Sequence, residues 1–227
     1  MVIFDCDGVL VDTETLHAKV LSACLASIDV CLSYDEVLVM FRGKSIATCQ
    51  ELVASLLIAH EPYKRWPQPK LDSFASDFWG RVHRETLQAF NDGVQPVAGV
   101  CELLQQLQLK KVPYCVASNG RHEKMQLSLT QAGLISFFPR SVRFSATEVE
   151  RGKPEPDLFL LAARTLGYSI NHCLVVEDSP SGAEAARRAG MPVLGYCPAG
   201  TTEDLAKQMR QQGAVIIRHM SEVLSKV

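Results

Sequence analysis

The fold of this chain is decided by the stretch Val2-Ile3-Phe4-Asp5-Cys6-Asp7-Gly8-Val9-Leu10-Val11-Asp12. Its first three residues are apolar and either β-branched or aromatic, which is typical of a buried strand. An unpaired carboxylate is too costly to bury inside a sheet, so we expect Asp5 at the carboxyl end of this strand. Open α/β sheets bind their ligands at that end, and Gly8 allows a sharp backbone turn just beyond it.

Two carboxylates lie two residues apart in this stretch, at Asp5 and Asp7. They repel each other unless a cation or a shared proton compensates. Oxygen ligands at such a position suit Mg²⁺. An Asp-x-Asp-Gly sequence is equally typical of a surface turn, because turns favour Asp and Gly. From these residues alone, a metal site and a surface turn both remain open.

Composition excludes several classes of protein. The chain has 227 residues, 47% hydrophobic and 21% charged, which is an ordinary globular balance for one large domain or a core with an insert. The formal net charge of −2 predicts no nucleic-acid partner. No apolar run reaches the length of a membrane span, so we expect no membrane partner and no targeting segment. Eight cysteines without Cys-x-x-Cys spacing argue against a zinc site and predict a reducing, cytoplasmic location.

The pattern of elements changes once along the chain. Residues 14–90 have apolar residues at helical spacing and no convincing strand. Three prolines between Pro62 and Pro69 predict a loop within this helical block. From Pro96 onward, helices alternate with strands. The strands are expected at residues 113–117, 142–144, 173–176, 192–196 and 214–217, and a last helix at residues 220–224.

This alternation predicts an α/β fold, with a parallel sheet and helices on both of its faces. The helical block is then an insert in that fold. We expect an α/β catalytic core of residues 1–13 and 95–227, joined by two short linkers to an all-helical cap of residues 14–94.

Four short motifs resemble those of the haloacid dehalogenase-like hydrolases, in their phosphatase and phosphomutase branch. They stand in the family's order, each at a strand end or a helix start. The resemblance runs from Val2 to about Tyr196, is weakest from Thr15 to Val94, and implies a Rossmann-like core with an inserted helical cap. The motifs are Asp5-Cys6-Asp7-Gly8-Val9-Leu10-Val11-Asp12-Thr13-Glu14, Val116-Ala117-Ser118-Asn119-Gly120, Gly152-Lys153-Pro154-Glu155-Pro156-Asp157 and Val175-Val176-Glu177-Asp178-Ser179.

The resemblance implies a role in catalysis or in metal binding for each of four carboxylates. Asp5 would be the nucleophile and form an aspartyl-phosphate. Asp7 would protonate the leaving oxygen and later activate water. Mg²⁺ would be bound by Asp5, the backbone carbonyl of Asp7 and Asp178, with Glu177 supporting it through water. Without the resemblance, the Glu177-Asp178 pair could equally be a helix cap ahead of a proline.

The same resemblance implies that three further residues, or the backbone beside them, bind or neutralise the phosphoryl group. Ser118 would hydrogen-bond it, together with backbone N–H groups near Asn119. Lys153 would offset the charge of the carboxylates and of the phosphoryl oxygens. Taken singly, Ser118 is more typical of a turn serine and Lys153 of a solvated loop lysine. Cys6 is expected to pack against the sheet rather than to act as a nucleophile.

Residues within and after the first motif narrow the choice of reaction. Halide-removing relatives lack an Asp at the position of Asp7, which favours phosphate esters over dehalogenation. The family's sugar-phosphate mutases carry residues matching Thr13, His17 and Gly43. Their cap arginine that binds a second phosphate corresponds here to Ile46, which argues against a mutase.

Basic residues beside that position could replace the missing arginine. We therefore expect Arg42 and Lys44 to bind substrate together with Thr13, His17 and Gly43. The plainer interpretations are an exposed basic turn for Arg42-Gly43-Lys44 and an exposed helix position for His17.

The sequence thus predicts a monomeric, cytoplasmic, Mg²⁺-dependent phosphatase of small phosphorylated metabolites, sugar phosphates foremost. A sugar phosphomutase of the β-phosphoglucomutase type is one alternative. A catalytically silent binding module on the same fold is another, and the intact set of Asp5, Asp7, Lys153 and Asp178 argues against it.

Overall fold

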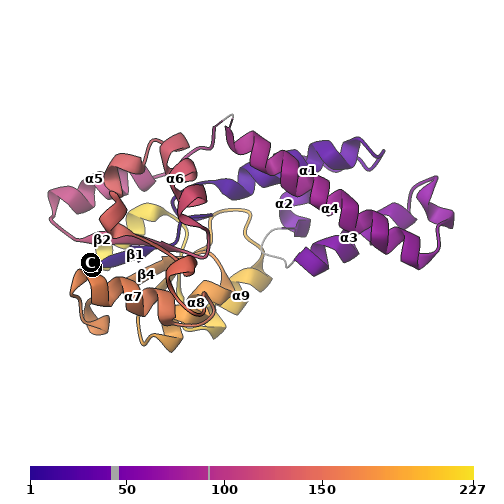
Figure 1. Ribbon diagram of the computed structural model, residues 1–227. Helices are drawn as coiled ribbons and strands as arrows, with labels where there is room; N and C mark the ends of the chain where they lie inside the picture. Colours follow the sequence, from indigo (N-terminus) through magenta and orange to yellow (C-terminus); the bar gives the residue numbers. More distant parts are fainter. Residues whose placement is uncertain (42–45, 92) are drawn as a thin grey trace. The chain divides into compact units, whose positions relative to one another are not determined.

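The structure is a computed structural model that describes residues 1–41, 46–91 and 93–227 (Figure 1). The chain divides into two compact units. One comprises Met1–Thr13 and Gly93–Val227 and is built on a sheet, and the other comprises Glu14–Asp92 and is helical.

The first unit contains six parallel strands in the order β3-β2-β1-β4-β5-β6. β1 lies between β2 and β4, and its register aligns Phe4 with Val116 and with Val176. Because the strands are parallel, the residues that follow Phe4, Val116 and Val176 lie side by side at the carboxyl ends of the strands. The strand bounds are β1 Val2–Phe4, β2 Tyr114–Ser118, β3 Arg143–Ser145, β4 Leu174–Glu177, β5 Val193–Tyr196 and β6 Val215–Ile217.

Helices cover both faces of this sheet. α7, α8 and α9 pack on one face, where Ile3, Val175 and Phe159 belong to one buried apolar cluster. α5 and α6 lie on the opposite face (Figure 1). The predicted fold class, a Rossmann-like parallel sheet with helices on both faces, is confirmed. The helices are α5 Val100–Leu109, α6 His122–Gln131, α7 Asp157–Leu166, α8 Pro180–Arg188 and α9 Glu203–Gln211.

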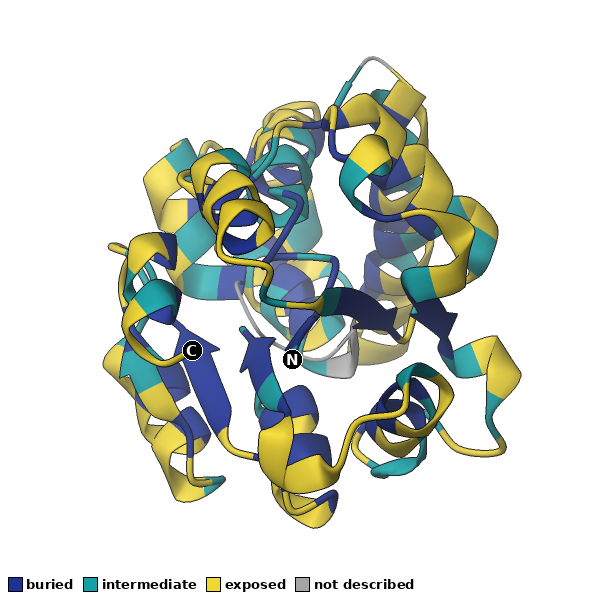
Figure 2. Cartoon of the chain, turned by 90° about the vertical axis from the view of Figure 1, so that its left-hand side faces the viewer, coloured by how far each residue is buried: buried dark blue, intermediate teal, exposed yellow. Residues whose placement is uncertain are grey.

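Small side chains set the distance between the sheet and the helices of the first face. Alanines on α7 and α8 are fully or almost fully buried and allow close packing on the strands. Phe159 is also fully buried, which stabilises the fold by about 1.5–3 kcal/mol relative to an exposed side chain. Figure 2 shows the strands mostly buried and the outer faces of the helices exposed. The buried alanines are Ala162, Ala163, Ala183, Ala185 and Ala186.

Short 3-10 segments connect the elements of this unit. Gly99, with φ +82°, lies directly before α5, a left-handed conformation that favours glycine. The segments are η2 Ile135–Phe137, η3 Arg140–Val142, η4 Ala146–Glu148, η5 Ile170–His172 and η6 Met220–Ser225.

The second unit is made of helices around its own apolar core. Leu21, Leu25 and Val53 are fully buried in this core. A capping box precedes α2: Ser33 Oγ accepts from the N–H of Glu36 at 3.3 Å, and Glu36 accepts from the N–H of Ser33 at 2.8 Å. The helices are α1 Thr13–Ala26, α2 Tyr34–Phe41, α3 Ile46–Ile58 and α4 Gln68–Asn91.

Two predicted elements differ from the structure. The run from Pro62 to Pro69 is not entirely a loop, because Tyr63–Arg65 forms the 3-10 turn η1 and α4 begins at Gln68. Pro69 lies in the first turn of α4, where a missing N–H leaves no helical hydrogen bond unmade. The last predicted helix, residues 220–224, is the 3-10 segment η6. Among the described residues, no helix is both long and apolar enough to cross a membrane.

Candidate active site

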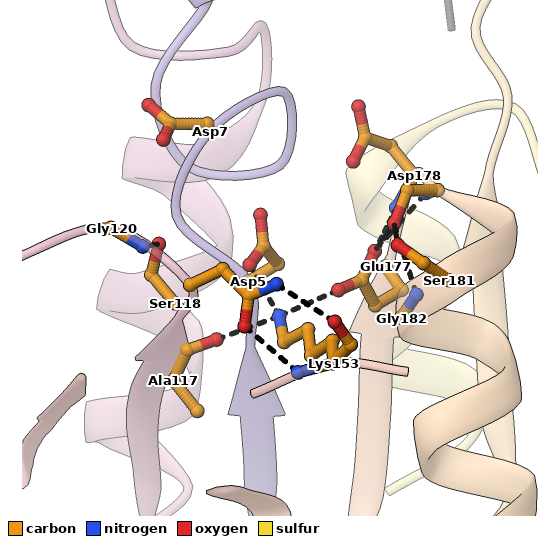
Figure 3. A network of polar contacts seen from close by, with 12 residues as sticks. Asp5, Asp7, Ala117, Ser118, Gly120, Lys153, Glu177, Asp178, Ser181 and Gly182 are labelled. Atoms are coloured by element: carbon orange, nitrogen blue, oxygen red, sulfur yellow. Dashed lines mark hydrogen bonds and ion pairs between the residues drawn. The ribbon is translucent and has the colours of Figure 1, made fainter. Parts of the chain in front are cut away.

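The ends of three neighbouring strands bring the predicted polar residues together (Figure 3). Asp5 directly follows β1, Ser118 ends β2, and Glu177 ends β4. The backbone N–H of Asp5 donates to Val176 O at 3.0 Å, which extends the pairing of β1 and β4 to this level. Asp178 follows Glu177, so that three carboxylates meet at one edge of the sheet.

Lys153 lies at the centre of this cluster. Its Nζ donates to Asp5 Oδ1 at 2.5 Å, to Glu177 Oε1 at 2.6 Å and to the backbone oxygen of Ala117 at 2.9 Å. Only 3% of its side chain is exposed. Burial alone would lower the pKa of Lys153, but Asp5 and Glu177 outweigh burial and raise it. The interpretation of Lys153 as a solvated loop lysine is therefore wrong.

Asp5 is buried beside this cation and beside other carboxylates. Burial raises the pKa of Asp5 to about 7, because the lowering effect of Lys153 is smaller and Glu177 and Asp7 raise it further. One lysine therefore does not compensate the negative charge gathered here, and the cluster favours a further cation.

Glu177 is held on both of its oxygens. Oε1 accepts from Lys153, and Oε2 accepts from the N–H of Asp178 at 3.0 Å, the N–H of Ser179 at 3.0 Å and Ser179 Oγ at 2.9 Å. Ser179 caps α8, since its Oγ accepts from the N–H of Gly182 at 3.1 Å. The residue that caps α8 is therefore Ser179, and not Glu177 or Asp178. Glu177 instead connects the start of α8 to Lys153 through hydrogen bonds.

A metal ion would find oxygen ligands at this edge. Asp5, Glu177 and Asp178 each offer a carboxylate oxygen, and these oxygens lie within 4.8 Å of one another. An all-oxygen set of this kind fits a hard cation such as Mg²⁺. Since both oxygens of Glu177 already accept hydrogen bonds, Asp5 and Asp178 are better placed as direct ligands. Gly8 keeps this space open, because a Cβ there would lie 1.9 Å from Asp178 Oδ2.

Asp7 is separate from the Lys153 cluster in Figure 3 and has its own cation. Its Oδ2 accepts from Lys124 Nζ at 2.7 Å, and its buried Oδ1 has no hydrogen-bond partner among the described residues. Burial alone would lower the pKa of Lys124, but Asp7 reverses this and raises it. Lys124 was not predicted from the sequence. The available signal was its place in the first turn of α6, six residues after Ser118, on a helix that starts at the sheet edge.

The loop after β2 turns back on itself. Ser118 is buried, and its Oγ accepts from the N–H of Gly120 at 3.0 Å. The side chain of Asn119 points to the loop that carries Lys153: its Nδ2 donates to Lys153 O at 3.1 Å and its Oδ1 accepts from the N–H of Lys153 at 2.9 Å. The Asn119 side chain thus binds the backbone of another site residue.

Cys6, between the two aspartates, is buried. Burial, followed by the neighbouring aspartates, raises the pKa of its thiol well above the ordinary value. A thiol that stays protonated is a poor nucleophile, in agreement with its expected packing role.

Of the predicted substrate residues before residue 45, the structure describes Thr13 and His17. His17 lies half-buried in the helical unit, with Nδ1 3.2 Å from Thr86 Oγ1 and its ring edge-on to Trp79 at 5.5 Å. Burial lowers the pKa of His17, so its imidazole is neutral near pH 7. Thr13 begins α1. The other predicted residues, Arg42, Gly43 and Lys44, lie outside the described residues.

A family model described as haloacid dehalogenase-like hydrolase matches residues 1–190. The chain belongs to this family. The family predicted from the four motifs is therefore confirmed.

Relatives of this hydrolase carry the names of phosphatases. It is 29% identical to the 6-phosphogluconate phosphatase of Escherichia coli (strain K12), over 86% of this chain and 81% of the relative. It is 34% identical to (DL)-glycerol-3-phosphatase 2 of Arabidopsis thaliana, over 85% of this chain and 77% of the relative. The predicted enzyme class, a phosphoric monoester hydrolase of this family, agrees with both comparisons.

Solved structures of this family share the fold. A HAD family hydrolase from Deinococcus radiodurans R1, crystallised with bound phosphate and sodium, is 30% identical and superimposes with a TM-score of 0.78. The match covers 98% of this hydrolase and 92% of that chain.

Proposed function

We propose that this hydrolase is a Mg²⁺-dependent phosphatase of small phosphorylated metabolites, sugar phosphates foremost, and that it acts through an aspartyl-phosphate on Asp5. The observation that carries the proposal is the position of Lys153 Nζ between Asp5 and Glu177, with a carboxylate oxygen of Asp178 within 4.8 Å of oxygens of both. The names of its relatives, which act on 6-phosphogluconate and on glycerol 3-phosphate, support a small phosphorylated polyol or sugar as substrate.

The first half of the reaction transfers the phosphoryl group to the enzyme. An oxygen of Asp5 attacks phosphorus, the ester P–O bond breaks, and Asp7 donates a proton to the leaving oxygen. Lys153 and Ser118 bind the transferred phosphoryl oxygens, with backbone N–H groups near Asn119. When bound by Asp5, Asp178 and the carbonyl of Asp7, Mg²⁺ supplies positive charge that offsets the developing negative charge.

The second half hydrolyses the aspartyl-phosphate. Asp7, now ionised, takes a proton from a water molecule as that water attacks phosphorus. The bond between phosphorus and the Asp5 oxygen breaks, which releases inorganic phosphate and restores both aspartates. Lys124 would orient Asp7 for this exchange, because it bonds to one of its two carboxylate oxygens.

Substrate contacts beyond the phosphoryl group are proposed for the segment 14–94, which would act as a cap on the core of residues 1–13 and 95–227. Thr13, His17 and the Arg42-Gly43-Lys44 segment would contact the leaving group. Ile46 in place of a phosphate-binding arginine supports hydrolysis over transfer between sugar positions. The cytoplasmic location and monomeric state predicted from the sequence are part of this proposal.

The proposal is tested by assaying the purified chain with Mg²⁺ against a panel of phosphorylated sugars, sugar acids and polyols, and measuring released phosphate. We expect turnover of several members and none with Asp5→Asn. Rapid sugar-phosphate isomerisation with negligible phosphate release would favour the mutase instead. A wild-type chain inactive on the whole panel and on small aryl phosphates would refute the proposal.

A further inference from the structure

Lys153 is a long, flexible side chain that must hold its Nζ in one place. Four rotatable bonds separate Nζ from the backbone, so fixing the backbone end reduces the freedom that remains. At the other end, three acceptors surround Nζ. The loop that carries Lys153 is far from Asp5 in sequence, so the backbone needs an anchor of its own at the sheet edge.

Asn119 forms that anchor through two hydrogen bonds to a single residue. Its amide group accepts from the N–H and donates to the carbonyl of Lys153, at 2.9 and 3.1 Å. Asn119 as a residue is exposed, yet both of its hydrogen-bonding groups face the Lys153 backbone. A primary amide can pair in this way with both polar groups of one residue, because its donor and its acceptor are separate atoms, whereas Ala at 119 offers neither.

Gly152 leaves room for this pairing. A Cβ at position 152 would lie 2.7 Å from Asn119 Oδ1 and 3.0 Å from Ala146 Cβ. Contacts that short do not occur between unstrained groups, so any larger residue would push the Asn119 amide away from Lys153.

The loop that carries Asn119 is itself fixed from a third strand. Ser145, fully buried at the end of β3, donates from Oγ to Gly120 O at 2.8 Å. Ser118 precedes Asn119 at the end of β2, and its Oγ accepts from the N–H of Gly120. Asn119 therefore links a loop that is held on both sides to the loop of Lys153.

We propose that Asn119 is a positioning residue: it acts on catalysis through the Lys153 backbone rather than by contact of its side chain with substrate. This inference rests on the proposed phosphatase function. Its consequence is that loss of the Asn119 amide displaces Nζ from Asp5 and slows the chemical step, while substrate still binds. Because Asp5 takes part in every turnover, the effect is the same for all substrates.

Asn119→Ala is expected to lower kcat about tenfold, which corresponds to about 1.4 kcal/mol in the activation barrier, with KM changed less than about twofold. The factor should be equal for a phosphorylated sugar and for a small aryl phosphate. Asn119→Asp keeps the acceptor for the Lys153 N–H and loses the donor, so it should recover part of the loss. Gly152→Ala should reproduce the loss from the other side of the contact.

Two matched controls separate this effect from general damage. Asn171→Ala removes an exposed asparagine from η5, and Gly80→Ala adds a Cβ in α4 whose nearest neighbour outside the helix backbone is Arg84 Nη1 at 3.6 Å. Both should leave kcat unchanged. A rise in KM for the phosphorylated sugar alone, with kcat intact, would show that Asn119 contacts substrate and would overturn the proposal.

A second measurement does not depend on activity. The Lys153 amide hydrogen, which donates to Asn119 Oδ1, should exchange with solvent about tenfold faster in Asn119→Ala, with core amides such as that of Val175 unchanged as the folding control. Unchanged exchange at Lys153 would overturn the proposal even if the wild-type chain hydrolysed no phosphate ester. If the wild-type chain hydrolyses no phosphate ester but the Lys153 amide still exchanges faster in Asn119→Ala, the anchoring role of Asn119 is supported and the proposed phosphatase function is refuted.

Discussion

Replacing Gly182 by alanine should destabilise this hydrolase, although alanine is by far the better helix former. Gly182 lies in the first turn of α8, and Ala is favoured over Gly inside a helix by about 1 kcal/mol. At this position, however, a Cβ would lie 1.8 Å from Oε1 and 1.9 Å from Cδ of Glu177. The carboxylate of Glu177 would have to leave its present place.

The cost of that displacement follows from the contacts of Glu177. The residue is 1% exposed and is bonded to Lys153, which is itself buried. Leaving one member of a buried ion pair uncompensated costs about 3–5 kcal/mol. After subtraction of the helix-propensity gain of about 1 kcal/mol, the free energy of unfolding should fall by about 2–4 kcal/mol. Phosphatase activity should fall with it, since Lys153 loses one of its three acceptors.

Urea unfolding of Gly182→Ala, with Gly80→Ala as the matched control in α4, measures this difference. The control should be at least as stable as the wild type. A Gly182→Ala protein as stable as the wild type would refute the reasoning. A double-mutant cycle identifies the cause: in a Glu177→Ala background, Gly182→Ala should be neutral or stabilising. An equal loss in both backgrounds would mean that Glu177 is not the group displaced.

Three further outcomes are expected. Asp5→Asn should keep the fold but lower phosphate release by several orders of magnitude, because the nucleophile is lost; a folded variant with a tenth of wild-type turnover would contradict this. Chelation of divalent cations should abolish activity and Mg²⁺ should restore it, whereas restoration by Zn²⁺ with Mg²⁺ inert would exclude the proposed site. Lys124→Met should lower kcat about tenfold, because Asp7 loses the cation that orients it. The free energy of unfolding should change by less than about 1 kcal/mol, because the ion pair is partly exposed. Kinetics and urea unfolding measure these two effects, and an unchanged kcat would show that Lys124 is dispensable.

The sequence was sufficient to predict those parts of the fold that depend on neighbouring residues in the chain. Apolar β-branched runs ending in a carboxylate or a small polar residue predicted the ends of β1, β2 and β4, and parallel strands necessarily bring such ends to one edge. Lys153 could be placed there only through the family resemblance, because its loop carries no periodic pattern. Its burial depends on Asp5 and Glu177, which are 148 and 24 residues away from it in sequence.

Contacts set by side-chain direction were not predictable in this way. Lys124 reaches Asp7 because α6 starts beside the end of β2, and no spacing in the sequence links two residues 117 positions apart. The amide of Asn119 and the missing Cβ of Gly182 matter only through neighbours from other loops. The position of Pro69 inside α4 was missed for a different reason: a proline indicates a loop or a helix start equally well.

The order of strands in the sheet also affects how the protein is made. β1 pairs with β2 and β4, and about 170 residues separate Phe4 from Leu174. At about 5–20 residues per second, the ribosome completes β1 roughly 10–30 s before β4 exists. All of Glu14–Asp92 emerges before either neighbour of β1. A nascent chain arrested before β4 therefore keeps its central strand without one of its two partners, and the catalytic edge of the sheet is completed only late in translation.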